Sequence, residues 1–135
     1  MKHVKIIAGI LVLAAVLGGA YFFAAAKRGL ASADRIAGAW TLESHNGQAV
    51  NGSISFQNDG IFSAQICNSY GGNYEINSGH LKFSKVAGTL MACIDKNLTS
   101  AEDAFRKFTE NGATAKIAGG KLEIAGAGDV LVFGK

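Results

Sequence analysis

The chain of 135 residues has no proline and has only two cysteines, two methionines and one tryptophan. Without proline, glycine, asparagine and aspartate must form the turns, because these residues tolerate positive φ angles. The chain also has no CxxC pair, no Gly-Lys-Ser/Thr phosphate loop and no GxSxG elbow. These absences argue against a zinc centre, a nucleotide-binding loop and an α/β-hydrolase.

A basic surface for nucleic acid is missing as well. The chain has 13 Lys and Arg against 10 Asp and Glu, a net charge of +3. Four of the basic residues lie within residues 1–33, which have no acid. Residues 34–135 therefore carry nine basic and ten acidic side chains, a net charge of −1. Because nucleic-acid binding needs a basic patch on the domain itself, we expect no nucleic-acid partner.

Residues 6–26 form a long apolar run without a charge, with Lys2 and Lys5 before it and Lys27 and Arg28 after it. As a helix this run would be about 30 Å long, the thickness of a bilayer's hydrocarbon core. It predicts a membrane contact through residues 6–26, as an uncleaved anchor or a cleaved signal. The length favours an anchor, whereas small residues at 24–26 and 31–33 would permit cleavage. We expect two parts: this N-terminal segment, residues 1–33, and an exported domain, residues 34–135.

The exported part alternates between short apolar–polar stretches and turn formers, which is typical of antiparallel strands. Residues 58–60 and 77–79 are hairpin signals, and residues 45–52 are interpreted as a loop or a wide hairpin turn. The last run is apolar on both faces, so we place it centrally or where a barrel closes. The predicted strands are residues 39–44, 53–57, 61–66, 73–76, 80–83, 114–118, 121–124 and 130–133.

One stretch has helical periodicity instead. Thr99 or Ser100 can cap a helix of about 11 residues that ends at Asn111-Gly112. Its apolar stripe would consist of Ala101, Ala104, Phe105 and Phe108. Glu102 and Asp103 fall in the first turn, where the helix dipole favours acids, so we interpret them as capping residues. The fold class is therefore α+β: an antiparallel β meander, barrel-like, of about eight short strands with one packed helix, preceded by an N-terminal transmembrane or signal helix.

The stretch after the third predicted strand contains the strongest candidate site. It begins at Cys67 and is interpreted as a tight reversal whose turn formers surround Tyr70. The candidate binding turn consists of Asn68, Ser69, Tyr70, Gly71 and Gly72. Tyr70 either contacts a ligand or folds back over a disulfide. Cys67 and Cys93 would enclose a loop of about 25 residues and stabilise the fold by roughly 3 kcal/mol as a disulfide; buried free thiols are the alternative.

No combination of residues predicts catalysis. A hydrolase-like site would need His45 or His80 as base, beside a nucleophile and a carboxylate. Ser44 precedes His45 along a strand, so their side chains point apart. We predict no catalytic residue, no metal, no cofactor and no enzyme activity. The alternatives are an enzyme with a dispersed site based on His45 or His80, and a small-ligand carrier. A core filled by aromatic side chains argues against the carrier: Trp40, Phe56, Phe62, Phe83 and Phe105.

Several segments occur in the order found in the META (HslJ-like) domain family, which the chain resembles from residue 36 to residue 133. They are residues 40–42 (WTL), 54–56 (ISF), 59–62 (DGIF), 67–74 (CNSYGGNY), 89–93 (TLMAC), 101–105 (AEDAF) and 120–124 (GKLEI). The resemblance implies a small α+β domain of the bacterial cell envelope, often membrane-tethered, without established catalytic residues. We therefore expect an inner-membrane-anchored or secreted periplasmic module. Its stress-related or assembly role would depend on binding an unknown envelope protein or ligand.

Overall fold

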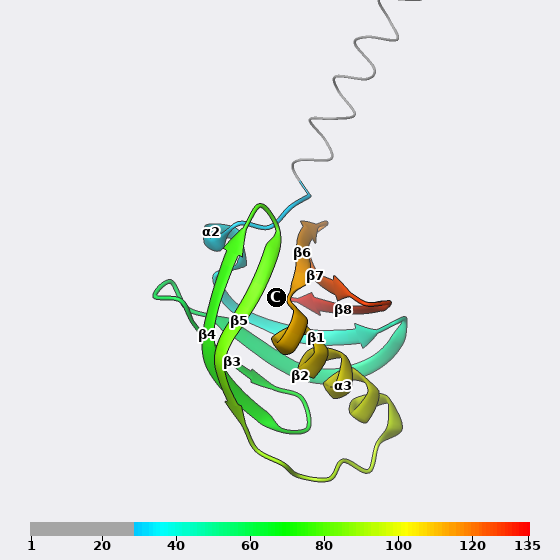
Figure 1. The fold of residues 1–135 in the computed structure, drawn as a ribbon. Helices are drawn as coiled ribbons and strands as arrows, with labels where there is room; N and C mark the ends of the chain where they lie inside the picture. Colours follow the sequence, from blue (N-terminus) through cyan, green and yellow to red (C-terminus); the bar gives the residue numbers. More distant parts are fainter. Residues whose placement is uncertain (1–28) are drawn as a thin grey trace, which may run out of the picture.

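The computed structural model describes residues 29–135, and the predicted membrane segment, residues 6–26, lies outside the described residues. Eight strands form a closed antiparallel barrel, and one long helix packs against it (Figure 1). The strands are β1 (Gly38–His45), β2 (Gln48–Phe56), β3 (Ile61–Gln65), β4 (Ser69–Asn77), β5 (His80–Gly88), β6 (Ala113–Ala118), β7 (Lys121–Gly126) and β8 (Asp129–Gly134). The short helix α2 (Ala33–Ile36) precedes β1, and α3 (Lys96–Asn111) connects β5 to β6. Neither α2 nor α3, the helices of this part of the chain, has the length and hydropathy of a membrane span.

Each strand pairs with the next one along the chain, and β8 pairs with β1 to close the barrel. The meander and the closing position of the last strand were both predicted. The loop or wide hairpin turn predicted at residues 45–52 is a tight hairpin turn instead, because β1 and β2 extend toward each other until two turn residues remain, Asn46 and Gly47. Both have positive φ, 49° and 83°, which matches the twist of a two-residue hairpin.

The junction between β5 and β6 is much shorter than the others. Only two residue pairs join these strands, His80 with Thr114 and Leu81 with Ala113. Beyond Leu81, β5 continues to Gly88 with β4 on one side, and α3 contacts it through Phe105, whose ring centroid lies 5.8 Å from that of Phe83 (Figure 1). The helix thus takes part in closing the barrel.

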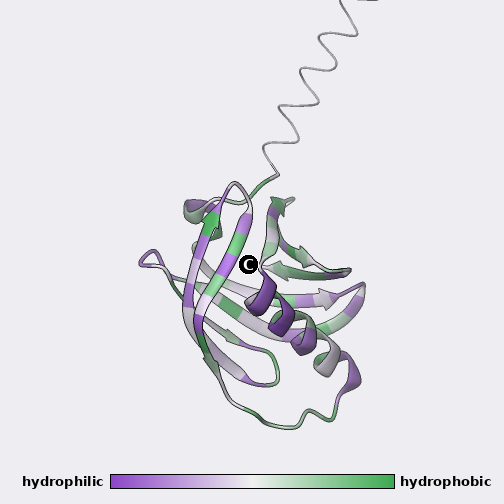
Figure 2. Ribbon diagram, viewed as in Figure 1, coloured by the Kyte–Doolittle hydropathy of each residue, from purple (hydrophilic) through white to green (hydrophobic). Residues whose placement is uncertain are grey.

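The core joins the inner face of the sheet to one face of α3. The four predicted apolar positions of the helix, Ala101, Ala104, Phe105 and Phe108, are all buried, while its outward face is polar (Figure 2). Phe105 packs edge-on against Phe62 and Phe83, with ring centroids 6.3 and 5.8 Å apart. Of the five aromatic residues expected in the core, only Phe83 is partly exposed.

The predicted start of the helix is wrong. The N-cap is Asp95, whose carboxylate accepts hydrogen bonds from the backbone N–H groups of Asn97 (2.8 Å) and Leu98 (3.2 Å). The helix therefore has 16 residues and already includes Thr99, whose hydroxyl donates to the carbonyl of Asp95. Because the helix begins earlier, Glu102 lies in its second turn and faces the sheet.

Candidate functional site

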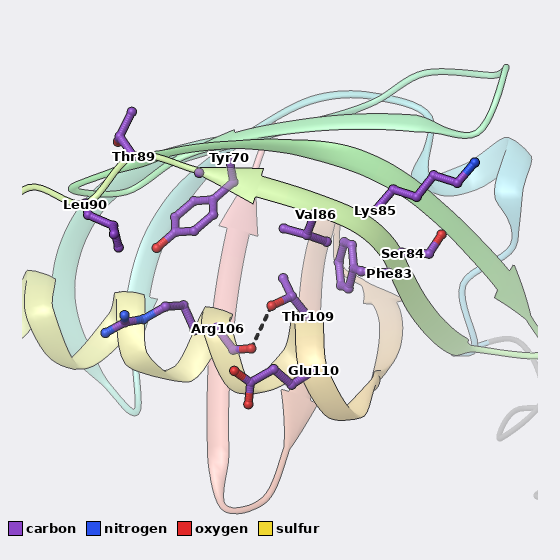
Figure 3. Close-up of a pocket in the computed structure, with 11 residues that line it drawn as sticks. Tyr70, Phe83, Ser84, Lys85, Val86, Thr89, Leu90, Arg106, Thr109 and Glu110 are labelled. Atoms are coloured by element: carbon purple, nitrogen blue, oxygen red, sulfur yellow. Dashed lines mark hydrogen bonds between the residues drawn. The ribbon is translucent and has the colours of Figure 1, made fainter.

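A groove of about 370 Å³ lies between β5 and α3, where the two strands of the short junction diverge (Figure 3). The sheet contributes aromatic and aliphatic side chains together with Ser84 and Lys85, and the helix contributes polar ones (Figure 3). The lining includes Tyr70, Phe83, Val86, Leu90, Arg106 and Glu110. A concave surface with an apolar wall and a few convergent polar groups has the character of a binding site.

Tyr70, the central residue of the candidate binding turn, lines this groove but does not lie at the tip of a turn. Strand β4 begins at Ser69, so Tyr70, Gly71 and Gly72 are strand residues paired with β3. Glycine is needed at position 72, because a Cβ there would lie 2.8 Å from the carbonyl oxygen of Ser84. The turn is thus confined to residues 66–68, and the predicted longer reversal is wrong.

The Tyr70 ring packs edge-on against Phe105, with the ring centroids 5.2 Å apart. Burial and then the negative charge of Glu102 raise the pKa of the Tyr70 hydroxyl to about 12. A hydrogen bond to the Glu102 carboxylate contributes to the same shift in the pKa of Tyr70. The hypothesis that Tyr70 contacts a ligand stays a prediction.

Asn68 and Glu102 form a buried polar pair behind the groove, each with 4% of its surface exposed. The Glu102 carboxylate accepts hydrogen bonds from the backbone N–H of Asn68 (2.6 Å) and from its Nδ2 (2.8 Å). The Asn68 side chain also accepts from the backbone N–H of Met91 (2.6 Å) and donates to the carbonyl oxygen of Met91 (3.2 Å). Helix, turn and loop are therefore joined through one asparagine.

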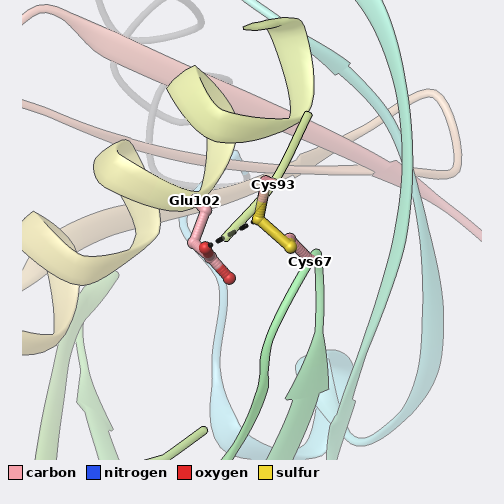
Figure 4. A group of neighbouring side chains, drawn as sticks. All are labelled: Cys67, Cys93 and Glu102. Carbon is pink, nitrogen blue, oxygen red and sulfur yellow. Dashed lines mark hydrogen bonds between the residues drawn. A yellow bond between two sulfur atoms is a disulfide. The ribbon is translucent and has the colours of Figure 1, made fainter. Parts of the chain in front are cut away.

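The predicted disulfide between Cys67 and Cys93 is present, with Cα atoms 6.1 Å apart. Figure 4 shows the Glu102 carboxylate beside it, with Oε2 3.5 Å from the Cys93 sulfur. The two sulfurs and a Glu102 oxygen lie within 4.8 Å of one another, a spacing at which three ligands could hold a metal ion. Cysteine binds metals as a thiolate, however, and sulfurs that are bonded to each other provide none. We therefore assign no metal to this group while the disulfide is formed.

The loop between β5 and α3, residues 89–95, carries the most exposed large aliphatic side chains of the described chain. Leu90, Met91 and Ile94 are 92%, 62% and 100% exposed. The loop is nevertheless fixed in place, because the disulfide holds Cys93 and the side chain of Asn68 holds Met91. Exposed aliphatic residues that cluster in this way are a common mark of an interaction surface. We call Leu90, Met91 and Ile94 the aliphatic loop surface.

The structure separates the two candidate histidines. His45 ends β1 and is mostly buried, and its Nε2 lies 2.9 Å from Oδ1 of Asp129. This hydrogen bond is the main reason why the pKa of the Asp129 carboxyl is lowered. Within residues 29–135, no hydroxyl or thiol shares a hydrogen bond with His45, and His80 is exposed at the start of β5. The histidine–aspartate pair joins the end of β1 to the start of β8.

Sequence reasoning missed Glu102 as a buried residue, and it also missed the groove residues Val86, Leu90 and Arg106. The one signal in the sequence was the run from Thr89 to Cys93, which places aliphatic residues between predicted elements. Nothing in the sequence around Glu102 indicated that it is buried, because its hydrogen-bond partner Asn68 is 34 residues away.

The chain is similar to one protein family and to proteins of known structure. A family model described as META domain matches residues 33–135. Heat shock protein HslJ of Escherichia coli (strain K12) is 26% identical over 99 residues, which are 70% of this chain and 71% of that protein. A protein solved by NMR has a TM-score of 0.70 and 23% identity, and the match covers 78% of this chain and 95% of that one. Another NMR structure, from Burkholderia xenovorans, has a TM-score of 0.56 and 18% identity over 76% and 84% of the two chains. Both share the fold.

Proposed function

The chain belongs to the META domain family, and we propose that it is a non-catalytic binding module of the bacterial cell envelope with a stress-related or assembly role. The aliphatic loop surface is the observation that carries this proposal. Leu90, Met91 and Ile94 remain exposed on a loop that a disulfide and a buried asparagine hold in place. A partner that covers these side chains would remove their apolar surface from water, which drives most protein association.

The disulfide and the apolar run support the envelope location. Structural disulfides persist outside the reducing cytosol, so a bond between Cys67 and Cys93 is what an envelope location would permit. Residues 6–26 have the length of a membrane anchor. The stress-related part of the proposal comes from similarity to a relative named heat shock protein HslJ.

The position of the loop favours a protein partner over the anchoring membrane. The chain enters the described domain at Gly29, whose carbonyl accepts from the N–H of Ile117, beside the turn that joins β4 to β5. The aliphatic loop surface lies at the opposite end of the barrel (Figure 1). The aliphatic loop surface is thus far from the point where an anchored chain would enter the domain.

We propose no catalysis because His45, the one histidine with a carboxylate partner, has no nucleophile beside it in the described domain. A carrier role inside the barrel is disfavoured by the filled interior. Phe56, Phe62 and Phe105 are each 1% exposed.

Cell fractionation tests the location. We expect the full-length protein in the membrane fraction, with its domain digested by protease in osmotically opened cells but not in intact ones. The alternative to the anchor, a cleaved signal, would give a periplasmic product that begins at or after Lys27. A protein that stays in the cytoplasm with reduced cysteines would contradict the envelope proposal.

Site-specific photo-crosslinking tests the binding role. A crosslinking amino acid placed at Ile94 should give a discrete adduct in intact cells, which a matched crosslinker at Ile61 should not give. Ile61 suits as control because it is also an exposed aliphatic residue, 43% exposed, but lies on β3. Identical crosslinking patterns at Ile61 and Ile94, or none at Ile94, would refute a binding role for the loop.

A further inference from the structure

We propose that the outer edge of β5 binds an extended segment of another protein, which adds to the sheet as a further strand beside the groove. The inference rests on the proposed binding function and names the class of partner. The segment would place an aliphatic side chain against Phe83 and Val86 and an acidic one beside Lys85. A small molecule or a lipid is the competing occupant.

The register shows which backbone groups form this edge. The N–H of Tyr74 donates to the carbonyl of Gly60 at 2.8 Å, so the main-chain groups of Tyr74 face β3. Phe83 lies directly opposite Tyr74 on β5. Opposed residues of an antiparallel pair exchange both hydrogen bonds or neither. The N–H and C=O of Phe83 therefore point away from β4, toward the groove.

The other end of the edge follows in the same way. The N–H of Thr89 donates to the carbonyl of Ser69 on β4, at 3.1 Å. Because successive residues of a strand face opposite sides, the main-chain groups of Gly88 point away from β4. Within residues 29–135, no strand pairs with β5 on this side beyond Leu81. A bulge at Lys85, whose φ is 51°, lies between Phe83 and Gly88, so a partner strand would pair with β5 at these two ends of the edge rather than along its whole length. Exposed strand edges bind extended peptides in many recognition domains.

The side chains beside the edge favour a peptide with alternating aliphatic and acidic residues. Phe83 and Val86 are partly exposed and give the groove its apolar wall (Figure 3). Lys85 is exposed and forms no ion pair with any residue of the described domain, whereas Arg106 of the helix is already paired with Asp103 at 2.7 Å. Lys85 is therefore the cation available to an acidic side chain of the added segment, whereas Glu110 of the helix disfavours an acid on its own side of the groove.

The extent of the apolar surface favours a peptide over a small molecule. The groove volume of about 370 Å³ is near the lower limit for small-molecule pockets, roughly 300–1,000 Å³. The aliphatic surface does not stop at the groove, because Leu90 lines it and leads into exposed Met91. A lipid chain would leave the N–H and C=O of Phe83 and Gly88 without partners, whereas a strand would pair with them.

Binding of a defined peptide to the full-length protein in detergent micelles tests the proposal. The probe is a capped peptide of alternating valine and glutamate, and its control is the same peptide N-methylated at alternate residues. We expect saturable binding by the first, at least tenfold weaker binding by the second, and slower amide exchange of Phe83 and Gly88 in the complex. Equal binding of the two peptides, no saturable binding, or full protection of both amides in the free protein would overturn the proposal.

Two variants and their controls locate the site. Val86→Arg and Lys85→Glu should each weaken binding of the valine–glutamate peptide about tenfold, which corresponds to about 1.4 kcal/mol. Ile61→Arg and Lys116→Glu make the same chemical changes on β3 and β6 and should leave binding unchanged. Lys85→Glu keeps the test valid if Val86→Arg fails to fold, because Lys85 is exposed. Equal effects of Lys85→Glu and Lys116→Glu would overturn the proposal.

The peptide-binding test of the β5 edge and the crosslinking test of the aliphatic loop surface can fail independently. If Ile94 crosslinks to a protein in cells while no peptide binds at β5, the binding module stands and the edge inference fails. If the peptide binds at β5 while Ile94 gives no adduct, the edge inference stands and the role of the aliphatic loop surface fails.

Discussion

Replacing Glu102 by glutamine should destabilise the protein by about 2 kcal/mol while leaving its fold unchanged. The carboxylate accepts two hydrogen bonds from Asn68, and a glutamine side chain has only one acceptor oxygen. Its NH₂ group would therefore face one N–H donor of Asn68. A hydrogen bond to a charged group contributes about 1.5–3 kcal/mol, and a buried unsatisfied donor costs about 1–3 kcal/mol.

One effect opposes this loss. Glu102 is almost fully buried, so removing its charge also removes a desolvation cost of several kcal/mol. The carboxylate, however, has two hydrogen bonds within 2.8 Å, which compensate that cost in the native protein. Losing one strong hydrogen bond and creating one donor–donor contact costs more than the removed desolvation penalty returns. We therefore expect Glu102→Gln to lower the free energy of unfolding by about 2 kcal/mol.

Urea unfolding at neutral pH under oxidising conditions measures the effect, with the fluorescence of the sole tryptophan, Trp40, as the signal. Trp40 is buried and donates its indole N–H to the carbonyl of Ile36 at 2.8 Å, so unfolding changes its environment. Amide exchange of Met91 gives a second readout, because Asn68 holds that residue and should hold it less firmly in the variant.

The matched control is the neighbouring acid. Asp103 is exposed and pairs with Arg106 on the helix surface, so Asp103→Asn should cost less than about 1 kcal/mol. The reasoning is refuted if Glu102→Gln unfolds within about 0.5 kcal/mol of the parent, a change typical of surface substitutions. It is refuted as well if Asp103→Asn proves equally costly.

Three further predictions concern the same region. Replacing both Cys67 and Cys93 by serine should lower the free energy of unfolding by roughly 3 kcal/mol, because their 26-residue separation closes a long loop; no change in urea midpoint would contradict this. Asp95→Ala should cost about 1 kcal/mol in the same assay, since it removes the N-cap of α3, whereas alanine at Ser100 should cost less. Phenolate absorbance should show Tyr70 titrating near pH 12 rather than at its ordinary pKa of 10.0, so its stabilising contribution is complete below pH 10 and is lost as the pH rises toward 12. A difference titration against Tyr70→Phe that places the transition at 10.0 would contradict this assignment.

Much of the fold was predictable from local patterns. Alternation placed Ile54 and Phe56 on the inner face of β2, and both are buried. The doubly apolar run at residues 130–133 marked the strand that closes the barrel against β1. Such patterns succeed because strand faces alternate and because each hairpin joins neighbours in the chain.

The errors arose where distant contacts decide the local structure. Gly71 and Gly72 suggested a turn, but they lie in β4, where Gly72 leaves room for the carbonyl groups of a bulge in β5. Lys85, at that bulge, has a φ of 51°, which no local rule indicates for lysine. Glu102 looked like a first-turn acid because two plausible caps preceded it, whereas Asp95 is the cap.

The candidate site was less predictable than the fold, because it depends on where β5 and β6 separate. The sequence indicates both strands, but it does not indicate that they pair over only two residues. The short junction leaves one edge of β5 beside α3 and creates the groove. A longer β6 partner would pair with Phe83 and remove the edge, so the site is a consequence of register rather than of any motif.

The disulfide and the hydrogen bonds that fix the aliphatic loop surface support the proposal that its exposure serves binding. Burying a side chain the size of Leu90 or Ile94 would contribute about 1.5–3 kcal/mol each, so an unrestrained loop would fold these residues onto the adjacent groove. The disulfide at Cys93 and the two hydrogen bonds between the Asn68 side chain and the Met91 backbone prevent that collapse. A chain without a partner would gain nothing from holding such side chains in water. Reduction of the disulfide should therefore decrease the exposure of Leu90 and Ile94, and with it the crosslinking yield from position 94.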